Sequence, residues 1–546
     1  MDMLTIRTDF PGGNGIVLEQ KENIIHLVQD VRDSSWWFYW NICIVAPPKG
    51  EFIFEFSKGE VIGPWGPAVS VDGAQWQWVG ADALCTKKTS EQWISIDSMT
   101  GKQSFRYSFK GTEEKVYLAR HFPYQVSRFE AMMRQIPTTN VTRSVLTTSE
   151  KGREIPLLVI SRERATRDFF LTCRHHSCES IASYVLEEMI RKLAAAPPSG
   201  VRFHIVPFVD IDGVEDGDPG KNRAPHDHNR DYIEKPLYRP TAALMEYMHG
   251  KNIEFHLDMH CPGIASRGRY EMLFYNVPYD SMPYFAYFKQ DVLVAARKIP
   301  RMLEIYNSHY DEVFDEVIAA SLATEYSRAQ GSFLSTSLEQ AYFLFDHPYT
   351  QADLALFGQM LADALTAYAK RGLTGLKNDD RLTASQCIQN GSFENFFGST
   401  DEQAGAVFPV GWTVVDGRND PQGKIAVSTD ARSGMYALLF SSSGQGEVYI
   451  YHRMKIEKPG SYHFNGYIKV EKNRANLEMF LAAHFLGTEK RLEMKASDLP
   501  ENGYLKVTLQ VDIPESEVGK VMELIIGIKS GAGEALIDDV SFEGEA

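Results

Sequence analysis

A short apolar segment of this chain is followed by two side chains that are able to bind a metal. The run from Phe169 to Leu171 reads as a buried strand, and His176 and Glu179 come shortly after it. In a tight turn, residues i and i+3 can direct two side chains at one point, and an imidazole with a carboxylate is a pair typical of zinc sites. A surface histidine beside a glutamate that favours a helix N-terminus is the alternative interpretation. A third ligand would decide between the two.

A second apolar segment offers that third ligand. Residues 253–260 alternate so that His256, Asp258 and His260 share one face, and Cys261-Pro262-Gly263 ends the strand directly after His260. Two histidines and one glutamate leave a fourth zinc position open, which is typical of a catalytic rather than a structural site. His256 lies deeper in the strand, where a hydrogen-bonded core histidine is the usual occupant.

These side chains need secondary structure that brings them to one place. The apolar spacing after Glu179 predicts a helix over residues 180–193, and the apolar runs 168–173 and 203–209 predict strands like the one at 253–260. Strands alternating with helices predict an α/β domain with a mixed, mostly parallel sheet and helices on both faces. Such sheets bind ligands beyond the carboxyl ends of their strands, where the three candidate ligands fall.

The flanking regions read as all-β. Residues 1–112 contain short apolar runs between Gly, Pro and Asp, which predicts an N-terminal β-sandwich. The α/β catalytic domain is expected over residues 113–376, followed by a polar linker at 377–387. Residues 388–546 alternate as in a second sandwich, a C-terminal jelly roll.

Composition excludes several classes of partner. The chain has 546 residues, a formal net charge of −16 at pH 7 and six cysteines without the spacing of a disulfide framework. The acidic balance argues against nucleic acid or an anionic membrane as the main partner. No basic segment followed by an apolar one opens the sequence, and no apolar run is long enough for a membrane span. We therefore expect a cytoplasmic protein; a secreted protein whose leader was removed is the alternative.

Three short motifs, in chain order, resemble the zinc carboxypeptidase family: His176-x-x-Glu179, Asp227-x-Asn229-Arg230 and Asp258-x-His260. The closer likeness is to the cytosolic-carboxypeptidase branch. That branch is similar in having a β-sandwich ahead of the catalytic domain, a Pro-x-x-x-x-Asp-Gly loop (Pro207 to Gly213) and a Thr-x-Leu-Glu strand (Thr336 to Glu339). The likeness covers the first two predicted domains.

The resemblance implies one catalytic zinc ion, held by His176, Glu179 and His260. It also implies that Asp227 holds the second nitrogen of the His176 ring, which fixes the tautomer. Glu339 would then be the general base. Glu325 is the rival for that role, although it stands in a helical context.

The same resemblance implies how a peptide substrate binds. Asn229 and Arg230 would hold its terminal carboxylate, and Arg223 would stabilise the oxyanion that forms when water attacks the scissile carbonyl. Tyr326 resembles the tyrosine of the family's mobile substrate loop. The preferred side chain of the substrate stays open: Phe333 in the pocket would favour an apolar residue, whereas Arg328 would favour an acidic one.

The C-terminal segment resembles the jelly-roll modules of the carbohydrate-binding type, through Asn390 to Glu394, Gly411-Trp412 and Leu536 to Phe542. This implies a carbohydrate partner. Asp538 shares a strand face with apolar residues, so its carboxylate needs hydrogen bonds or a cation. A structural calcium ion held by Glu394 and Asp538 is one solution, and a hydrogen-bonded Asp538 without metal is the other.

The prediction from sequence is thus a zinc metallocarboxypeptidase that hydrolyses the C-terminal amide bond of a peptide or peptide-like substrate through metal-activated water. One alternative is an amidase or deacylase acting on a small carboxylate-bearing or cell-wall-derived substrate. A non-catalytic binding protein is the second.

Overall fold

The computed structural model of the protein describes most of the chain. The described residues are 3–34, 38–57, 61–85, 102–162, 165–261, 271–275, 285, 288, 291–292, 294–295, 304–307, 322–343, 348–371, 393, 396–397, 408–409, 412–415, 423–444, 446–456, 458–472, 475–485, 488–500, 502–518 and 521–544. The chain divides into two compact units, residues 1–277 with 295–370 and residues 278–294 with 371–546. Within the described residues, no helix is both long and apolar enough to cross a membrane.

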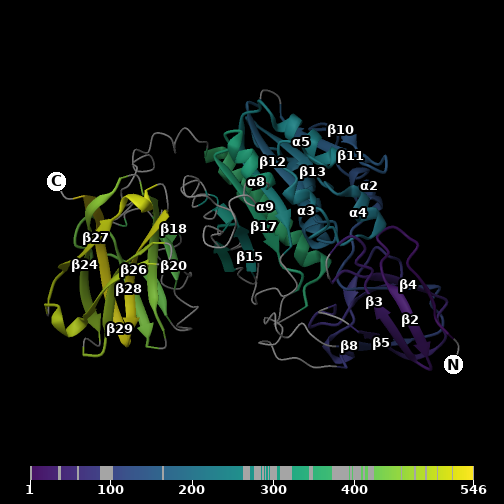
Figure 1. Cartoon of the computed structure of the whole chain (residues 1–546), viewed down its shortest axis with the longest axis horizontal. Helices are drawn as coiled ribbons and strands as arrows, with labels where there is room; N and C mark the ends of the chain where they lie inside the picture. Colours follow the sequence, from purple (N-terminus) through teal and green to yellow (C-terminus); the bar gives the residue numbers. More distant parts are fainter. Residues whose placement is uncertain are drawn as a thin grey trace. The chain divides into compact units, whose positions relative to one another are not determined.

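The first unit begins with two sheets that pack face to face (Figure 1). One has the order β1-β4-β9-β6-β7 and the other β2-β3-β5-β8. Their shared core includes Ile42, Phe54 and Leu118, from three different strands. The strands are β1 (Thr5–Arg7), β2 (Ile16–Lys21), β3 (Ile24–Val28), β4 (Asn41–Val45), β5 (Gly50–Phe56), β6 (Ala68–Ser70), β7 (Gln77–Trp78), β8 (Gln103–Phe109) and β9 (Lys115–Ala119).

The N-terminal sandwich extends past residue 112, where the sequence placed its end. Strand β9 pairs antiparallel with both β4 and β6, so it lies inside the first sheet. A local pattern cannot show which sheet a short strand joins, because that depends on partners far away in the chain. The first α-helix of the described residues, α2 (Val126–Met133), follows β9.

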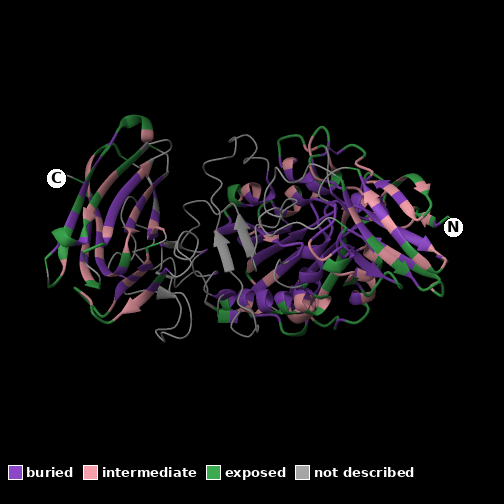
Figure 2. Ribbon diagram, turned by 90° about the horizontal axis from the view of Figure 1, so that it is seen from below, coloured by how far each residue is buried: buried purple, intermediate pink, exposed green. Residues whose placement is uncertain are grey.

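An eight-stranded mixed sheet forms the centre of the same unit, with the order β10-β11-β13-β12-β14-β17-β15-β16. The four strands β13, β12, β14 and β17 are parallel to one another. The strands are β10 (Val141–Thr148), β11 (Glu154–Ser161), β12 (Arg167–Cys173), β13 (Val201–Val206), β14 (Ile253–His260), β15 (Glu271–Tyr275), β16 (Glu304–Asn307) and β17 (Leu334–Gln340). Every residue of β14 is buried, as the burial colours of Figure 2 also show for the centre of this sheet.

Helices cover both faces of this sheet. On one face, Tyr368 of α9 (Gln351–Arg371) packs against Phe169 and Phe255. On the other, Tyr247 of α5 (Arg239–Met248) packs against Phe170 and His204. The remaining α-helices of the described residues in this unit are α3 (Ser180–Ala195), α4 (Ile211–Asp216) and α8 (Ala323–Ala329). The predicted α/β class with flanking β-sandwiches is confirmed.

The second unit contains two five-stranded sheets around one core (Figure 1). Their orders are β20-β23-β28-β25-β26 and β21-β22-β29-β24-β27, a sandwich as the sequence predicted. The strands are β18 (Phe396–Phe397), β19 (Phe408–Pro409), β20 (Thr413–Val415), β21 (Lys424–Ser428), β22 (Ala437–Ser443), β23 (Val448–Lys455), β24 (Gly460–Lys472), β25 (Glu478–Phe485), β26 (Thr488–Lys495), β27 (Leu505–Ile513), β28 (Val521–Ser530) and β29 (Ala532–Gly544). The predicted linker at 377–387 lies outside the described residues.

Candidate metal centre and active site

The structure brings the three predicted metal ligands together at the carboxyl edge of the central sheet. His176 and Glu179 lie in the turn between β12 and α3, and His260 is the last residue of β14. His176 Nδ1 lies 3.0 Å from Glu179 Oε1, and His260 Nδ1 lies 2.8 Å from Glu179 Oε2. One ligand atom from each residue falls within 4.8 Å of the other two, and all three residues are buried. Two imidazoles and one carboxylate therefore converge on one point.

The second nitrogen of each ligand histidine faces a carboxylate. His176 Nε2 lies 3.5 Å from Asp227 Oδ1, and His260 Nε2 lies 2.7 Å from Asp258 Oδ2. Such partners fix the ring orientation and leave the Nδ1 lone pair for a metal. The donor set thus fits zinc, with one coordination position left for water or substrate.

The charges of this cluster depend on one another. Burial alone would lower the pKa of His176, but the carboxylates of Glu179 and Asp227 raise it. Burial likewise opposes ionisation of Glu179, yet His176, Lys221 and His260 hold its pKa well below the ordinary value. A buried glutamate that stays ionised among cationic partners is suited to bind a metal cation.

Asp258 contacts two further residues of the site, Thr172 and His175, in addition to His260. Its Oδ1 accepts a hydrogen bond from Thr172 Oγ1 at 2.7 Å and lies 2.8 Å from His175 Nδ1. His175, Asp258 and His260 also form a second group of metal-capable atoms. Because Asp258 is already bonded to Thr172, His175 and His260, we assign it to holding the rings in place. His256, the predicted core histidine, is buried and bonds Thr172 Oγ1 through Nε2 at 2.9 Å.

Glu339, the predicted base, lies beside the ligands. It stands directly opposite His260 in the parallel pairing of β14 and β17. Its Oε2 is enclosed and has no hydrogen-bond partner among the described residues. Burial raises the pKa of Glu339 to about 6, with Lys221 opposing this shift and Glu179 adding to it. A carboxylate oxygen without a partner, next to a metal centre, is available to accept a proton.

Lys221 is a member of the site that the sequence analysis missed. Its Nζ lies 3.1 Å from Glu179 Oε1. Burial lowers its pKa, but Glu179 and Glu339 raise it by more, so the ammonium stays charged. The only signal in the sequence was a lysine two residues before Arg223 in a long polar loop.

The predicted carboxylate-binding residues adjoin the ligands. Asp227 caps the short 3-10 helix His228–Arg230 by accepting a hydrogen bond from Asn229 N at 2.9 Å. The Asn229 side-chain amide lies 3.1 Å from His260 Nε2, and its Oδ1 accepts from Ala323 N. The guanidinium of Arg230 donates to Asn229 O at 2.9 Å, and no carboxylate of the described residues lies within ion-pair distance of it.

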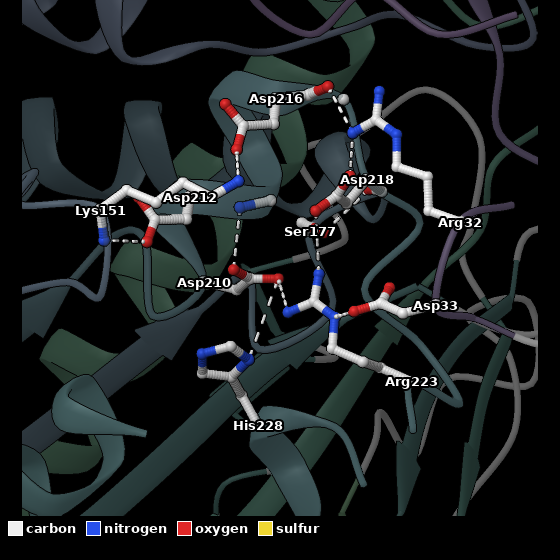
Figure 3. A network of polar contacts seen from close by, with 12 residues as sticks. Arg32, Asp33, Lys151, Ser177, Asp210, Asp212, Asp216, Asp218, Arg223 and His228 are labelled. Atoms are coloured by element: carbon white, nitrogen blue, oxygen red, sulfur yellow. Dashed lines mark hydrogen bonds and ion pairs between the residues drawn. The ribbon is translucent and has the colours of Figure 1, made fainter. Parts of the chain in front are cut away.

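Arg223 lies in a network of charges instead (Figure 3). Its guanidinium nitrogens lie 3.2 Å from carboxylate oxygens of Asp33, Asp210 and Asp218. Asp33 belongs to the N-terminal sandwich, where Arg32 pairs with Asp218 as well. These contacts join the sandwich to the loop after α4. They leave the oxyanion role of Arg223 a prediction without support from its contacts.

Three further predicted residues are engaged with one another or with α5. Tyr326 lies in helix α8, and its hydroxyl donates a hydrogen bond to Met245 O at 3.0 Å. The described contacts therefore do not bring Tyr326 to the three metal ligands. Glu325, the rival base, accepts two hydrogen bonds from the guanidinium of Arg328. Arg328 is therefore paired on its own helix, and the choice between Arg328 and Phe333 as specificity residue stays a prediction.

The calcium prediction for the second unit has no support. Asp538 Oδ2 accepts hydrogen bonds from the backbone N–H groups of Arg432 and Ser433, and its Oδ1 accepts one from Asp539 N. The buried carboxylate is thereby satisfied without a cation. Glu394, the second predicted ligand, lies outside the described residues.

Comparison with known proteins finds a family match for part of the chain. Residues 128–254 match the zinc carboxypeptidase family. A metallo-carboxypeptidase from Burkholderia cenocepacia has 18% sequence identity, over 68% of this chain and 100% of its own, with a TM-score of 0.55. A metallo-carboxypeptidase from Pseudomonas aeruginosa, solved with (2-guanidinoethylmercapto)succinic acid, has 18% identity over 67% of this chain and 99% of its own, with a TM-score of 0.53. At such identity these two similarities show the fold alone.

Two other findings are weaker. A carbohydrate-binding module solved with β-1,4-galactotriose has 17% identity, over 29% of this chain and 97% of its own. Its TM-score of 0.21 is too low to support an argument, so the carbohydrate partner stays a prediction. The comparison with curated proteins found no match. The resemblance to the cytosolic branch also stays a prediction.

Proposed function

This chain carries a zinc carboxypeptidase domain, and on that premise we propose that it hydrolyses the C-terminal amide bond of a peptide or peptide-like substrate with a free terminal carboxylate. One observation supports this most directly. Glu339 Oε2 is enclosed without a hydrogen-bond partner among the described residues, opposite His260 and beside the other two ligands. A proton acceptor and a metal centre therefore lie together at the sheet edge.

His176, Glu179 and His260 would hold the zinc ion through two Nδ1 atoms and a carboxylate. Bound zinc supplies Lewis acidity, which lowers the pKa of water and polarises a carbonyl group. Glu339 takes a proton from the attacking water and passes it to the leaving amine. Asp227 and Asp258 keep the two imidazole rings oriented throughout.

Arg230 is the residue we assign to the terminal carboxylate of the substrate. Its guanidinium lies next to Asn229, whose amide contacts His260, so a carboxylate bound at Arg230 lies close to the metal centre. A guanidinium binds a carboxylate through two parallel hydrogen bonds, which fixes the substrate in orientation as well as position. That placement favours cleavage of the last amide bond over internal bonds.

The test uses zinc-loaded full-length protein and matched peptides with free or amidated C-termini. We expect cleavage of the free peptides only, and a loss of roughly 100-fold in kcat/KM for Arg230→Lys, because lysine cannot form the bidentate pair. Arg239→Lys, an exposed arginine at the start of α5, is the control.

Equal cleavage of free and amidated peptides by the parent and by Arg230→Lys would contradict the proposal. A panel of N-acylated amino acids and cell-wall-derived peptides belongs in the same assay. Cleavage confined to that panel would favour the amidase or deacylase alternative.

A further inference from the structure

Hydrolysis of an amide bond is accelerated by a hydrogen-bond donor or a cation near the scissile carbonyl oxygen, because negative charge develops there as water adds to the carbon. The resemblance assigned this group to Arg223. In the structure, however, Arg223 is only 9% exposed and its guanidinium contacts three carboxylates. Moving it to a substrate would leave the buried carboxylate of Asp210 without its cation, which is costly.

Lys221 is the other cation of the same loop, and its backbone is held against the metal-binding turn. Cys178 N donates to Pro219 O at 3.1 Å, and Ser177 Oγ donates to Asp218 O at 2.9 Å. On the far side, Asn222 N donates to Asp227 Oδ2 at 3.2 Å. The position of Lys221 is thus fixed between the turn that carries His176 and Asp227, the carboxylate that faces the His176 ring.

Gly220 allows this close approach. Its φ is +75°, and a Cβ atom there would lie 2.3 Å from Ser177 Oγ and 2.5 Å from Ser177 N. Only glycine meets both conditions. The loop therefore packs directly on the turn, and the next side chain along the chain is that of Lys221.

The two cations of the loop have different partners. Asn222, between them, has a φ of 52° in the left-handed region. Lys221 Nζ lies 3.1 Å from Glu179 Oε1, whereas Arg223 lies among Asp33, Asp210 and Asp218 (Figure 3). The loop thus directs one cation to the metal centre and uses the other to join the N-terminal sandwich.

We propose that Lys221, and not Arg223, is the catalytic cation that stabilises the oxygen of the scissile carbonyl. As the water oxygen bonds to the carbonyl carbon, the C=O π electrons move onto the carbonyl oxygen. The Lys221 ammonium donates a hydrogen bond to that carbonyl oxygen. The electrons return when the C–N bond breaks, and the amine takes its proton from Glu339. Lys221 gives up no proton. This inference rests on the proposed function. The flexible side chain of Lys221 allows Nζ to move from Glu179 to the substrate.

The test measures binding as well as turnover on zinc-loaded protein. The probe is a phosphonate analogue of a cleaved peptide, which mimics the tetrahedral, negatively charged state. For Lys221→Met we expect full zinc content, a fall of about 100-fold in kcat with KM little changed, and a matching rise in the phosphonate inhibition constant. Lys221→Arg should recover part of both losses. Lys251→Met, at the opposite end of β14, is the control.

Phosphonate affinity at the parental level in Lys221→Met would overturn the proposal, since Lys221 would then serve only as counter-ion to Glu179. Failure of the proposed function differs from this result: there, the zinc-loaded parent would neither cleave the peptide nor bind the phosphonate. An active parent with an equally active Lys221→Met variant would exclude this inference alone.

Discussion

Glu339 lies directly opposite His260 in the parallel pair of β14 and β17. The register of two neighbouring strands thus sets a proton acceptor and a metal ligand at the same level of one sheet edge. Residue 260 ends its strand, and residue 339 lies one position before the end of its own. The position of the base relative to this ligand is therefore set by the backbone pairing of the sheet.

Replacing Glu339 with Gln should separate binding from chemistry. Glutamine keeps the shape but cannot accept the proton, so kcat should fall by about 100-fold or more while zinc content and phosphonate affinity stay near the parental values. Steady-state kinetics with elemental analysis checks this. Glu325→Gln, which removes only a carboxylate paired with Arg328, is the matched control. Near-parental turnover in Glu339→Gln would move the assignment to Glu325.

His176→Ala and His260→Ala should each remove the zinc ion. Each variant loses one of three protein ligands, and the sheet that carries them has its own core, so circular dichroism should change little. Zinc per chain, measured after dialysis, checks the loss. His249→Ala, an exposed histidine, should keep the parental zinc content. Retention of zinc by the double variant His176→Ala/His260→Ala would disprove the ligand set.

Asp258→Asn should weaken zinc binding without abolishing it. The change removes the charge that faces His260 Nε2 and His175 Nδ1 and disturbs their tautomers. We expect a 10- to 100-fold loss of zinc affinity, roughly the range found for such supporting carboxylates. Competition with a chelator measures it, with the exposed Asp9→Asn as control. Unchanged affinity would show that Asp258 does not act through the His260 ring.

Asp210 and Arg223 should be coupled in stability. Asp210→Ala leaves the guanidinium of Arg223 partly unpaired, and Arg223→Met leaves buried Asp210 unpaired, so each change should cost about 3 kcal/mol of unfolding free energy. The double variant should cost less than the sum of the two. Denaturant unfolding of all four proteins gives the coupling energy. Additive effects would mean that Asp210 and Arg223 do not stabilise one another.

Asp168 should make the first unit less stable at acid pH. Burial would raise its pKa, but hydrogen bonds from His204 and Arg202 lower it to about 2. Because the folded pKa lies below the unfolded value, the stabilisation is present above about pH 4 and is lost as pH falls toward 2. Burial lowers the pKa of His204, which also contacts Tyr247. Folding stability therefore falls further as the pH drops below the unfolded pKa of this histidine. Asp168→Asn should therefore be less stable by about 2 kcal/mol at neutral pH, with a smaller difference at pH 3. A pH-independent difference in the unfolding midpoint would contradict this.

The sequence by itself determined which residues could carry the chemistry. His176 and Glu179 follow one apolar run, and His260 ends another, so the periodicity that predicts strands also places these side chains at strand ends. That inference is local, since it needs only the two-residue repeat of a strand and a turn after it. The α/β class and both sandwiches followed from the same kind of pattern.

The tertiary structure decided the partners of those residues. Lys221 meets Glu179 across 42 positions of the chain, and Arg223 meets Asp33 of a different sheet system. Ion pairs of this kind depend on how loops pack, and a sequence pattern contains no information about which of two nearby cations faces which carboxylate. For this reason the family resemblance assigned the oxyanion to Arg223, whereas in the folded loop it is Lys221 that contacts the metal ligand Glu179.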